Sequence, residues 1–116
     1  MAVHLYGIRN CDTMKKARTW LDAQGVDYVF HDYKVEGADA AWLRGLVDKV
    51  GWEAVLNRAG TTFRKLPEAE RSGLDAEKAI ALMVAQPSMI KRPVLVAGEE
   101  IRLGFKPDVY GALFKG

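Results

Sequence analysis

The first third of the chain combines two short apolar stretches with one helical pattern. Residues 3–8 (VHLYGI) alternate between apolar and polar positions, which is typical of a short strand. Apolar residues then recur at helical spacing over residues 14–21, and Gly25 suits the position just after a helix. Residues 28–33 (YVFHDY) are aromatic and β-branched and predict a second strand. Strand, helix and strand in this order form a βαβ unit.

The middle of the chain changes to helical spacing throughout. Asp39 is placed to cap a helix that ends at Gly51. Asp75 is placed to cap a further helix that Pro87 ends. Residues 34–88 show no strand pattern. We therefore expect a helical insertion that covers about residues 37–87.

The end of the chain returns to strands. Residues 94–97 are continuously apolar, residues 98–99 form a turn, and residues 101–103 pair back as a hairpin. Pro107 suits the first position of a last helix. The order βαβ, helices, ββα predicts an α/β fold with a thioredoxin-like mixed four-stranded sheet and a helical insertion between its halves. We expect residues 1–116 to form one domain.

Composition limits the classes of function. Of the 116 residues, 49% are hydrophobic and 28% are charged, as in ordinary globular domains, and a net charge of +2 argues for neither nucleic acid nor a membrane as partner. A single cysteine excludes an internal disulfide, and with only two histidines we expect no metal site. The N-terminal residues lack a secretory signal pattern. We expect a cytoplasmic monomer.

Cys11 is the first candidate for chemistry. A lone cytosolic cysteine is more often buried and inert than reactive. Cys11, however, falls where the first strand meets the first helix, and there unpaired N–H groups and the helix dipole favour an anion. Asp12, Thr13 and Lys15 follow in the first turn, where we expect them to support the thiolate, which is the nucleophilic form. Because Met14 replaces the second cysteine of a CxxC motif, a resolving thiol must come from another molecule.

The Arg92-Pro93 pair is the second candidate. Proline at the start of a strand is common, and most X–Pro bonds are trans. The alternative is a cis bond that faces Cys11 and leaves the backbone of Arg92 to pair with an extended thiol-bearing ligand.

The remaining candidates are basic side chains. Exposed, solvated charges are the ordinary interpretation for such residues. Arg58 and Arg92 flank predicted turns, and a guanidinium can hold a carboxylate or an oxyanion through two hydrogen bonds. His4 and His31 lie in predicted strands, where we expect packing or partial exposure and no catalytic role.

Several motifs together resemble the ArsC/Spx family of thioredoxin-fold proteins, and most closely its YffB-like branch. The resemblance covers nearly the whole chain in the family's order. It is carried by YGIRNCDTMKKA (residues 6–17), HDY (31–33), NRAGTTFRKL (57–66), MIKRPVL (89–95) and GFKP (104–107).

The family implies a nucleophilic cysteine at Cys11 and a cis proline at Pro93. Some members reduce arsenate with glutathione and glutaredoxin, YffB-like members are regarded as glutathione-dependent thiol reductases, and Spx-like members regulate transcription by binding RNA polymerase. Glutathione-linked arsenate reductases use the cysteine with three arginines. Here Arg92 matches one arginine, Asn57 takes the place of another with Arg58 one residue later, and Lys106 takes the place of the third.

Two further departures bear on the activity. Arsenate reductases of that type carry a histidine four residues before the cysteine, where this chain has Gly7. Met14 stands where Spx-like regulators have the second cysteine of their redox switch.

The sequence therefore favours a glutathione-dependent thiol reductase that binds no cofactor and uses glutathione, with or without glutaredoxin, as co-substrate. Arg58, Arg92, Pro93 and Lys106 would bind glutathione or the substrate. Two alternatives remain: an arsenate reductase, and an Spx-like interaction protein in which Cys11 is idle.

Overall fold

The computed structural model describes residues 2–114, and the chain divides into two compact units. One unit holds both ends of the chain, up to Asp32 and from Arg92 onward, and the other comprises Tyr33–Lys91. The predicted helical insertion, residues 37–87, falls inside the second unit. That the chain forms a single domain stays a prediction.

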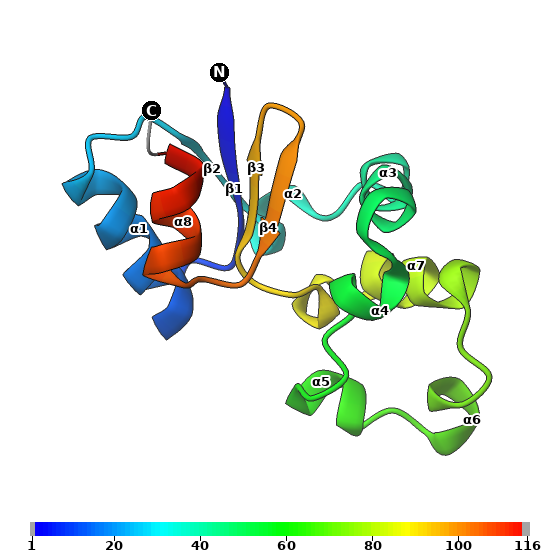
Figure 1. The fold of residues 1–116 in the computed structure, drawn as a ribbon. Helices are drawn as coiled ribbons and strands as arrows, with labels where there is room; N and C mark the ends of the chain where they lie inside the picture. The colour runs from blue at the N-terminus through cyan, green and yellow to red at the C-terminus, as the bar shows by residue number, and fades with distance from the viewer. Residues whose placement is uncertain (1, 115–116) are drawn as a thin grey trace. The chain divides into compact units, whose positions relative to one another are not determined.

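The first unit contains the sheet. Its strands are β1 (Val3–Gly7), β2 (Val29–Asp32), β3 (Val94–Ala97) and β4 (Glu100–Leu103). They lie in the order β2-β1-β3-β4, with β1 parallel to β2 and antiparallel to β3, and with β3 and β4 forming a hairpin (Figure 1). The predicted mixed four-stranded sheet of thioredoxin-like order is confirmed.

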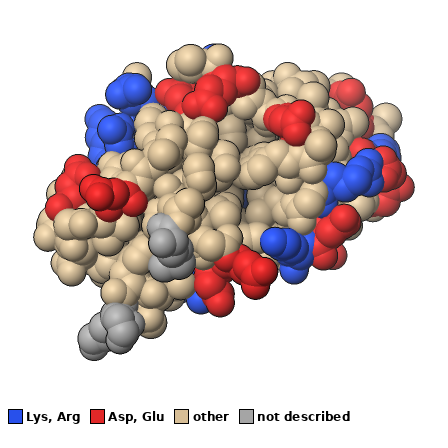
Figure 2. All heavy atoms as spheres, turned by 90° about the horizontal axis from the view of Figure 1, so that it is seen from above, with Lys and Arg blue, Asp and Glu red and all other residues tan. Residues whose placement is uncertain are grey.

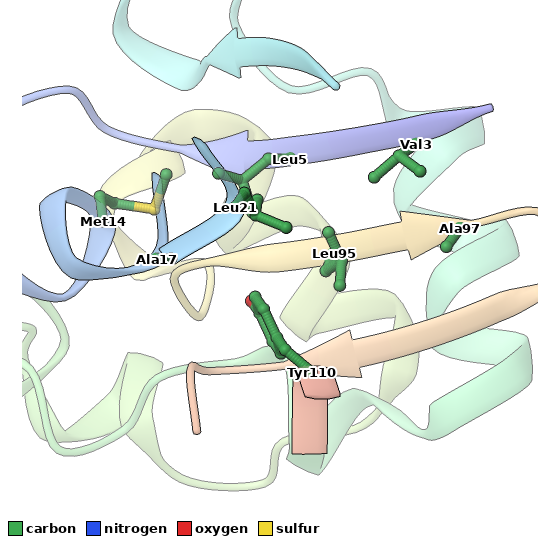
Figure 3. Close-up of a cluster of buried hydrophobic side chains, with 8 residues drawn as sticks. All are labelled: Val3, Leu5, Met14, Ala17, Leu21, Leu95, Ala97 and Tyr110. Atoms are coloured by element: carbon green, nitrogen blue, oxygen red, sulfur yellow. The ribbon is translucent and has the colours of Figure 1, made fainter. Parts of the chain in front are cut away.

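Two helices, α1 (Asp12–Ala23) and α8 (Pro107–Phe114), pack on one face of this sheet. Gly25 follows α1 with a φ of 69°, a backbone conformation that glycine adopts without steric cost. Alternate residues of the strands point into the core, together with one side of each helix (Figure 3). The buried cluster consists of Val3, Leu5, Met14, Ala17, Leu21, Leu95, Ala97 and Tyr110.

Tyr110 joins the core to the α1–α8 contact. The side chain is fully buried, and its hydroxyl donates a hydrogen bond to the Gly104 carbonyl at 2.9 Å. Burial raises the pKa of the Tyr110 phenol, so the hydroxyl stays a donor. The ring meets Trp20 and Phe105 edge-on, with centroid distances of 5.8 and 4.9 Å. Such pairs stabilise beyond the area they bury, by about 0.5–1.5 kcal/mol each.

The second unit is helical. Its elements are α2 (Tyr33–Glu36), α3 (Ala40–Val50), α4 (Trp52–Val55), α5 (Thr61–Arg64), α6 (Glu68–Arg71), α7 (Ala76–Ala85) and a 3₁₀ turn (Pro87–Met89). Both predicted caps are confirmed. Asp39 accepts the Trp42 N–H at 2.9 Å, and Asp75 accepts the Lys78 N–H at 2.8 Å.

Helices α3 and α7 pack together in this unit. Their buried faces contribute Leu43, Leu46 and Val47 on one side and Ile80 and Met83 on the other. At the surface, Arg44 and Glu77 form a two-pronged ion pair with N–O distances of 2.6 and 2.8 Å. Because this pair is exposed, packing contributes more to the α3–α7 contact than charge does.

The structure differs from the sequence predictions in its shortest elements. The second strand ends at Asp32, because Tyr33 already begins α2. Helices α2, α5 and α6 have four residues each, and a single turn carries no periodic pattern by which to predict it.

The surface carries both signs of charge. On the face that Figure 2 shows, lysine and arginine side chains are interspersed with aspartate and glutamate side chains. Among residues 2–114, no helix is both long and apolar enough to cross a bilayer.

The Met14 side chain leaves room only for glycine at position 7. A Cβ atom at this position would overlap the Met14 sulfur and would lie 2.7 Å from its terminal methyl group. The Met14 side chain is fully buried, so it has little room to move away. The Met14 thioether therefore fills the space that a side chain at position 7 would need.

We predict that Gly7→Ala destabilises the protein by about 1–3 kcal/mol through overpacking. In the double variant Gly7→Ala/Met14→Ala, the total loss should be smaller than the sum of the two single losses, because the new methyl group enters space that Met14 has left. The free energy of unfolding by denaturant measures both. Gly45→Ala in α3 is the control, since a Cβ there meets no atom within 4 Å. Additive losses would contradict the steric coupling.

Candidate functional site

Cys11 is the N-cap residue of α1. Its backbone is extended, with φ −128° and ψ 129°, and its carbonyl accepts the Lys15 N–H at 2.9 Å as the first hydrogen bond of the helix. The side chain is half-buried. The backbone N–H groups of Thr13 and Met14 in the first turn interact with the sulfur and favour its anionic form.

The environment of Cys11 stabilises the thiolate. Burial raises the pKa of the Cys11 thiol, but hydrogen bonds from the Met14 and Thr13 backbone N–H groups lower it, as do a hydrogen bond and the positive charge of Arg92. The balance holds the pKa below the usual value for cysteine. Since the thiolate is the reactive form, this arrangement is suited to nucleophilic chemistry.

The sheet brings Arg92 to Cys11. The strands β1 and β3 are antiparallel, with Tyr6 opposite Val94, so the residues that precede β3 lie beside those that follow β1. The Arg92-Pro93 bond is cis, as the family resemblance implies. Pro93 is buried, and its carbonyl accepts the Gly104 N–H at 2.8 Å.

Asp32 supports the loop before Cys11. It is the last residue of β2, opposite Gly7 in the parallel pair, and it is buried. Its carboxylate accepts the Arg9 N–H at 3.3 Å. Asp32 is not among the site residues predicted from the sequence, although a carboxylate at the end of an aromatic strand is an available signal. This hydrogen bond with Arg9 ties the loop before Cys11 to the end of β2.

The three residues predicted to support the thiolate are exposed. Asp12, Thr13 and Lys15 lie at the surface of α1, and the Thr13 N–H is one of the groups that stabilise the thiolate. The Arg9 guanidinium lies 5.5 Å from the centre of the Phe30 ring. The thiolate-supporting roles of Asp12 and Lys15 stay predictions.

The two remaining basic candidates belong to different units. Lys106 is exposed just before α8, in the unit that holds Cys11. Arg58 is exposed in the loop between α4 and α5 of the helical unit, and its guanidinium lies 5.6 Å from the centre of the Trp52 ring. Their roles in binding glutathione or substrate stay predictions.

The histidines lie on the sheet. His4 Nδ1 and His31 Nε2 are hydrogen-bonded at 2.9 Å, and the His31 ring stacks on Tyr6 with centroids 4.5 Å apart. Both are partly buried, as expected from their strands. Among residues 2–114, no three histidine, cysteine or acidic side chains are grouped as metal ligands.

The solved structures similar to this chain include two of high sequence identity. The YffB protein is 62% identical, with a TM-score of 0.93, over 96% of this chain and 97% of that chain. An arsenate reductase (ArsC) related protein from Brucella melitensis is 61% identical, with a TM-score of 0.79, over 99% and 96% of the two chains.

Curated proteins similar in sequence to this chain cover almost its whole length. An uncharacterized protein of Haemophilus influenzae is 36% identical over 112 residues, which cover 97% of this chain and 98% of the relative. The global transcriptional regulator Spx 1 of Lactococcus lactis is 25% identical over 108 residues, which cover 91% and 84%. The model of the ArsC family matches residues 6–113. This chain therefore belongs to the ArsC family.

Proposed function

We propose that the protein is a glutathione-dependent thiol reductase in which Cys11 is the nucleophile. The observation that carries the proposal is the lowered pKa of Cys11 under the Met14 and Thr13 N–H groups and Arg92. Because this is the sole cysteine of the chain, the thiol that completes the reaction comes from another molecule. Glutathione supplies such a thiol in the reducing cytoplasm.

The reaction consists of thiol–disulfide exchanges. The Cys11 thiolate attacks one sulfur of a disulfide substrate, forms a mixed disulfide and expels the other sulfur as a thiolate. A glutathione thiolate attacks the Cys11 sulfur and expels the second substrate thiolate. A second glutathione then releases Cys11 as oxidised glutathione forms. The substrate gains two electrons, and two glutathione molecules supply them; a glutaredoxin can replace glutathione in the last step.

In this proposal the basic side chains bind anions. Arg92 holds the Cys11 thiolate and, with Lys106 and Arg58, the carboxylates of glutathione. Arg92 and Pro93 border the space for the cysteine unit of glutathione, beside the start of β3. A monomer with no bound cofactor suffices.

An arsenate reductase is a second candidate, and the arsenate reductase related structure from Brucella melitensis favours it. Two features weigh against it. Asn57 and Lys106 replace two of the three arginines that the family resemblance implies. Gly7 replaces the histidine, and the Met14 thioether fills the space beside it.

An interaction protein is a third candidate, because the relatives include transcriptional regulators. In that case Cys11 has no catalytic role, and binding of the partner is insensitive to Cys11→Ser. An internal disulfide switch is excluded by the single cysteine.

We predict that alkylation of Cys11 by iodoacetamide has a pH midpoint below about 8.5, the value for a free cysteine. Since a lowered pKa extends the thiolate form to lower pH, reactivity should be lost only as the pH falls through the lowered value. Arg92→Gln should move the midpoint upward, because one of the groups that lower the pKa is removed. Arg102→Gln, which removes the same charge on β4, should leave the midpoint unchanged. A wild-type midpoint at or above about 8.5 refutes the activated thiolate.

With oxidised glutathione, we expect the intact mass to increase by one glutathionyl group in the wild type and not in Cys11→Ser. Lys106→Gln should slow this reaction about two- to fivefold, as loss of an exposed charge pair does. Lys49→Gln on α3 is the control of equal charge. An unmodified wild-type protein contradicts the glutathione-dependent reaction.

We expect arsenate to be reduced poorly by this protein with glutathione and glutaredoxin. Loss of one charge-assisted contact to a buried oxyanion costs on the order of 1.5–3 kcal/mol, about ten- to a hundredfold in rate. The chain departs from the arsenate reductase pattern at Gly7 and Asn57, so two such losses are expected. A coupled assay that follows arsenite formation measures this. Efficient turnover would reverse the order of the first two candidates.

A further inference from the structure

A groove runs along α1 away from Cys11. Its volume is about 520 Å³, within the range of small-molecule sites. One wall is formed by α1 through Lys15, Lys16, Thr19, Trp20 and Ala23. The other wall is the segment that enters α8, through Phe105 and Pro107. We call these seven residues the α1 groove.

The α1 groove begins one helical turn from the nucleophile. Cys11, Lys15 and Thr19 are spaced by four residues, and residues at this spacing are neighbours on one side of a helix. The Lys15 N–H bonds to the Cys11 carbonyl at 2.9 Å, so this spacing is helical from the cap onward. A molecule in the groove would extend toward the sulfur.

The floor of the α1 groove is aromatic and rigid. The Trp20 and Phe105 rings lie 6.5 Å apart, and both rest edge-on against Tyr110. Tyr110 is fully buried and held by its hydrogen bond to Gly104. Trp20 is only half-buried, so part of its indole remains available for stacking. The surface therefore favours a flat aromatic ring, with little ordering cost on the protein side.

The rim of the α1 groove is positive. Lys15 and Lys16 line the groove. Lys106 lies between Phe105 and Pro107 in the sequence, the two residues of the opposite wall. All three are exposed, and the ion pairs found among residues 2–114 involve none of them. Asp12 and Asp108, in the first turns of α1 and α8, are acidic neighbours that do not line the groove. An aromatic floor under a lysine rim matches an aromatic ring that carries an anionic group.

We propose that the α1 groove binds the aromatic group of an anionic substrate of Cys11, namely an aryl disulfide that carries a carboxylate or a sulfonate. The catalytic part of this proposal rests on the proposed function. The Cys11 thiolate attacks one sulfur of the aryl disulfide, a protein–aryl disulfide forms, and one aryl thiolate leaves. A glutathione thiolate, from the reductant of the proposed function, then attacks the Cys11 sulfur and expels the second aryl thiolate. A second glutathione releases the Cys11 thiolate as oxidised glutathione forms.

The first experiment measures binding without thiol chemistry. Anilinonaphthalene sulfonate is titrated into Cys11→Ser, with its fluorescence and the amide NMR shifts of the protein as readouts. We expect saturable binding with shifts at Trp20, Phe105 and Lys16, and weaker binding of phenylnaphthylamine, which lacks the sulfonate.

Matched variants in the same background locate the dye. Ala23→Trp should fill the groove and weaken binding at least roughly tenfold, whereas Ala112→Trp, an equal change at an exposed position of α8 outside the groove, should not. Lys16→Gln should weaken binding about two- to fivefold and Lys49→Gln should not. Equal affinities within either pair, or shifts outside the groove, overturn the site.

The second experiment links the α1 groove to Cys11 in the wild-type background. Ala23→Trp should slow the reaction with dithiobis(nitrobenzoate), an anionic aryl disulfide, and should leave the rates with hydroxyethyl disulfide and iodoacetamide unchanged. If all three rates fall together, or none changes, the assignment of substrate class is wrong. The two proposals can also fail separately. If the dye binds in the groove but oxidised glutathione does not modify Cys11, the groove is confirmed and the glutathione-dependent reaction is wrong.

Discussion

The turn from β1 into α1 is the constraint on which the site depends. Residues 8–11 connect β1 to α1, and the first N–H groups of that helix have no backbone partners within it. Cys11 occupies the cap, and the N–H groups of Thr13 and Met14 stabilise a negative charge on its sulfur. Asp32, buried at the end of β2, holds the Arg9 N–H of the same turn. The sheet supplies the remaining positive charge, because the antiparallel β3 begins where β1 ends and Arg92 lies at that point.

Much of this arrangement is local and was therefore predictable from the sequence. The caps at Asp39 and Asp75 involve N–H groups only three residues away. The strand β3 shows as an unbroken apolar stretch because its residues on both faces of the sheet are buried or half-buried. The place of Cys11 follows from the same local logic, since it lies between a strand pattern over residues 3–8 and a helical pattern over residues 14–21.

What the sequence left open depends on contacts between distant segments. The sequence and the family resemblance place Arg92 near Cys11 as a ligand-binding residue. They do not indicate the hydrogen bond from its side chain to the Cys11 sulfur, because that bond depends on how β3 lies against β1. The crowding of Gly7 by Met14 depends on how α1 packs on β1, and no periodic pattern encodes that fit. Single-turn helices such as α5 are local, but the sequence does not predict them because four residues are too few to show a helical period. The burial of Asp32 is not predictable from the sequence, because charged residues in strands usually face solvent.

The fully buried Tyr110 has a consequence for the thermodynamics of the whole unit. Its ring is part of the core that holds α1 and α8 on the sheet, and Trp20 and Phe105 lie against it in edge-to-face contacts. The surface aromatics therefore exist as a platform only while the helices are docked. A molecule that stacks there binds the folded chain and not the unfolded one, so its binding energy adds to the free energy of unfolding by mass action. Ligand binding at the surface aromatic rings and folding of the core are therefore linked equilibria, and Tyr110 couples them because it packs against both.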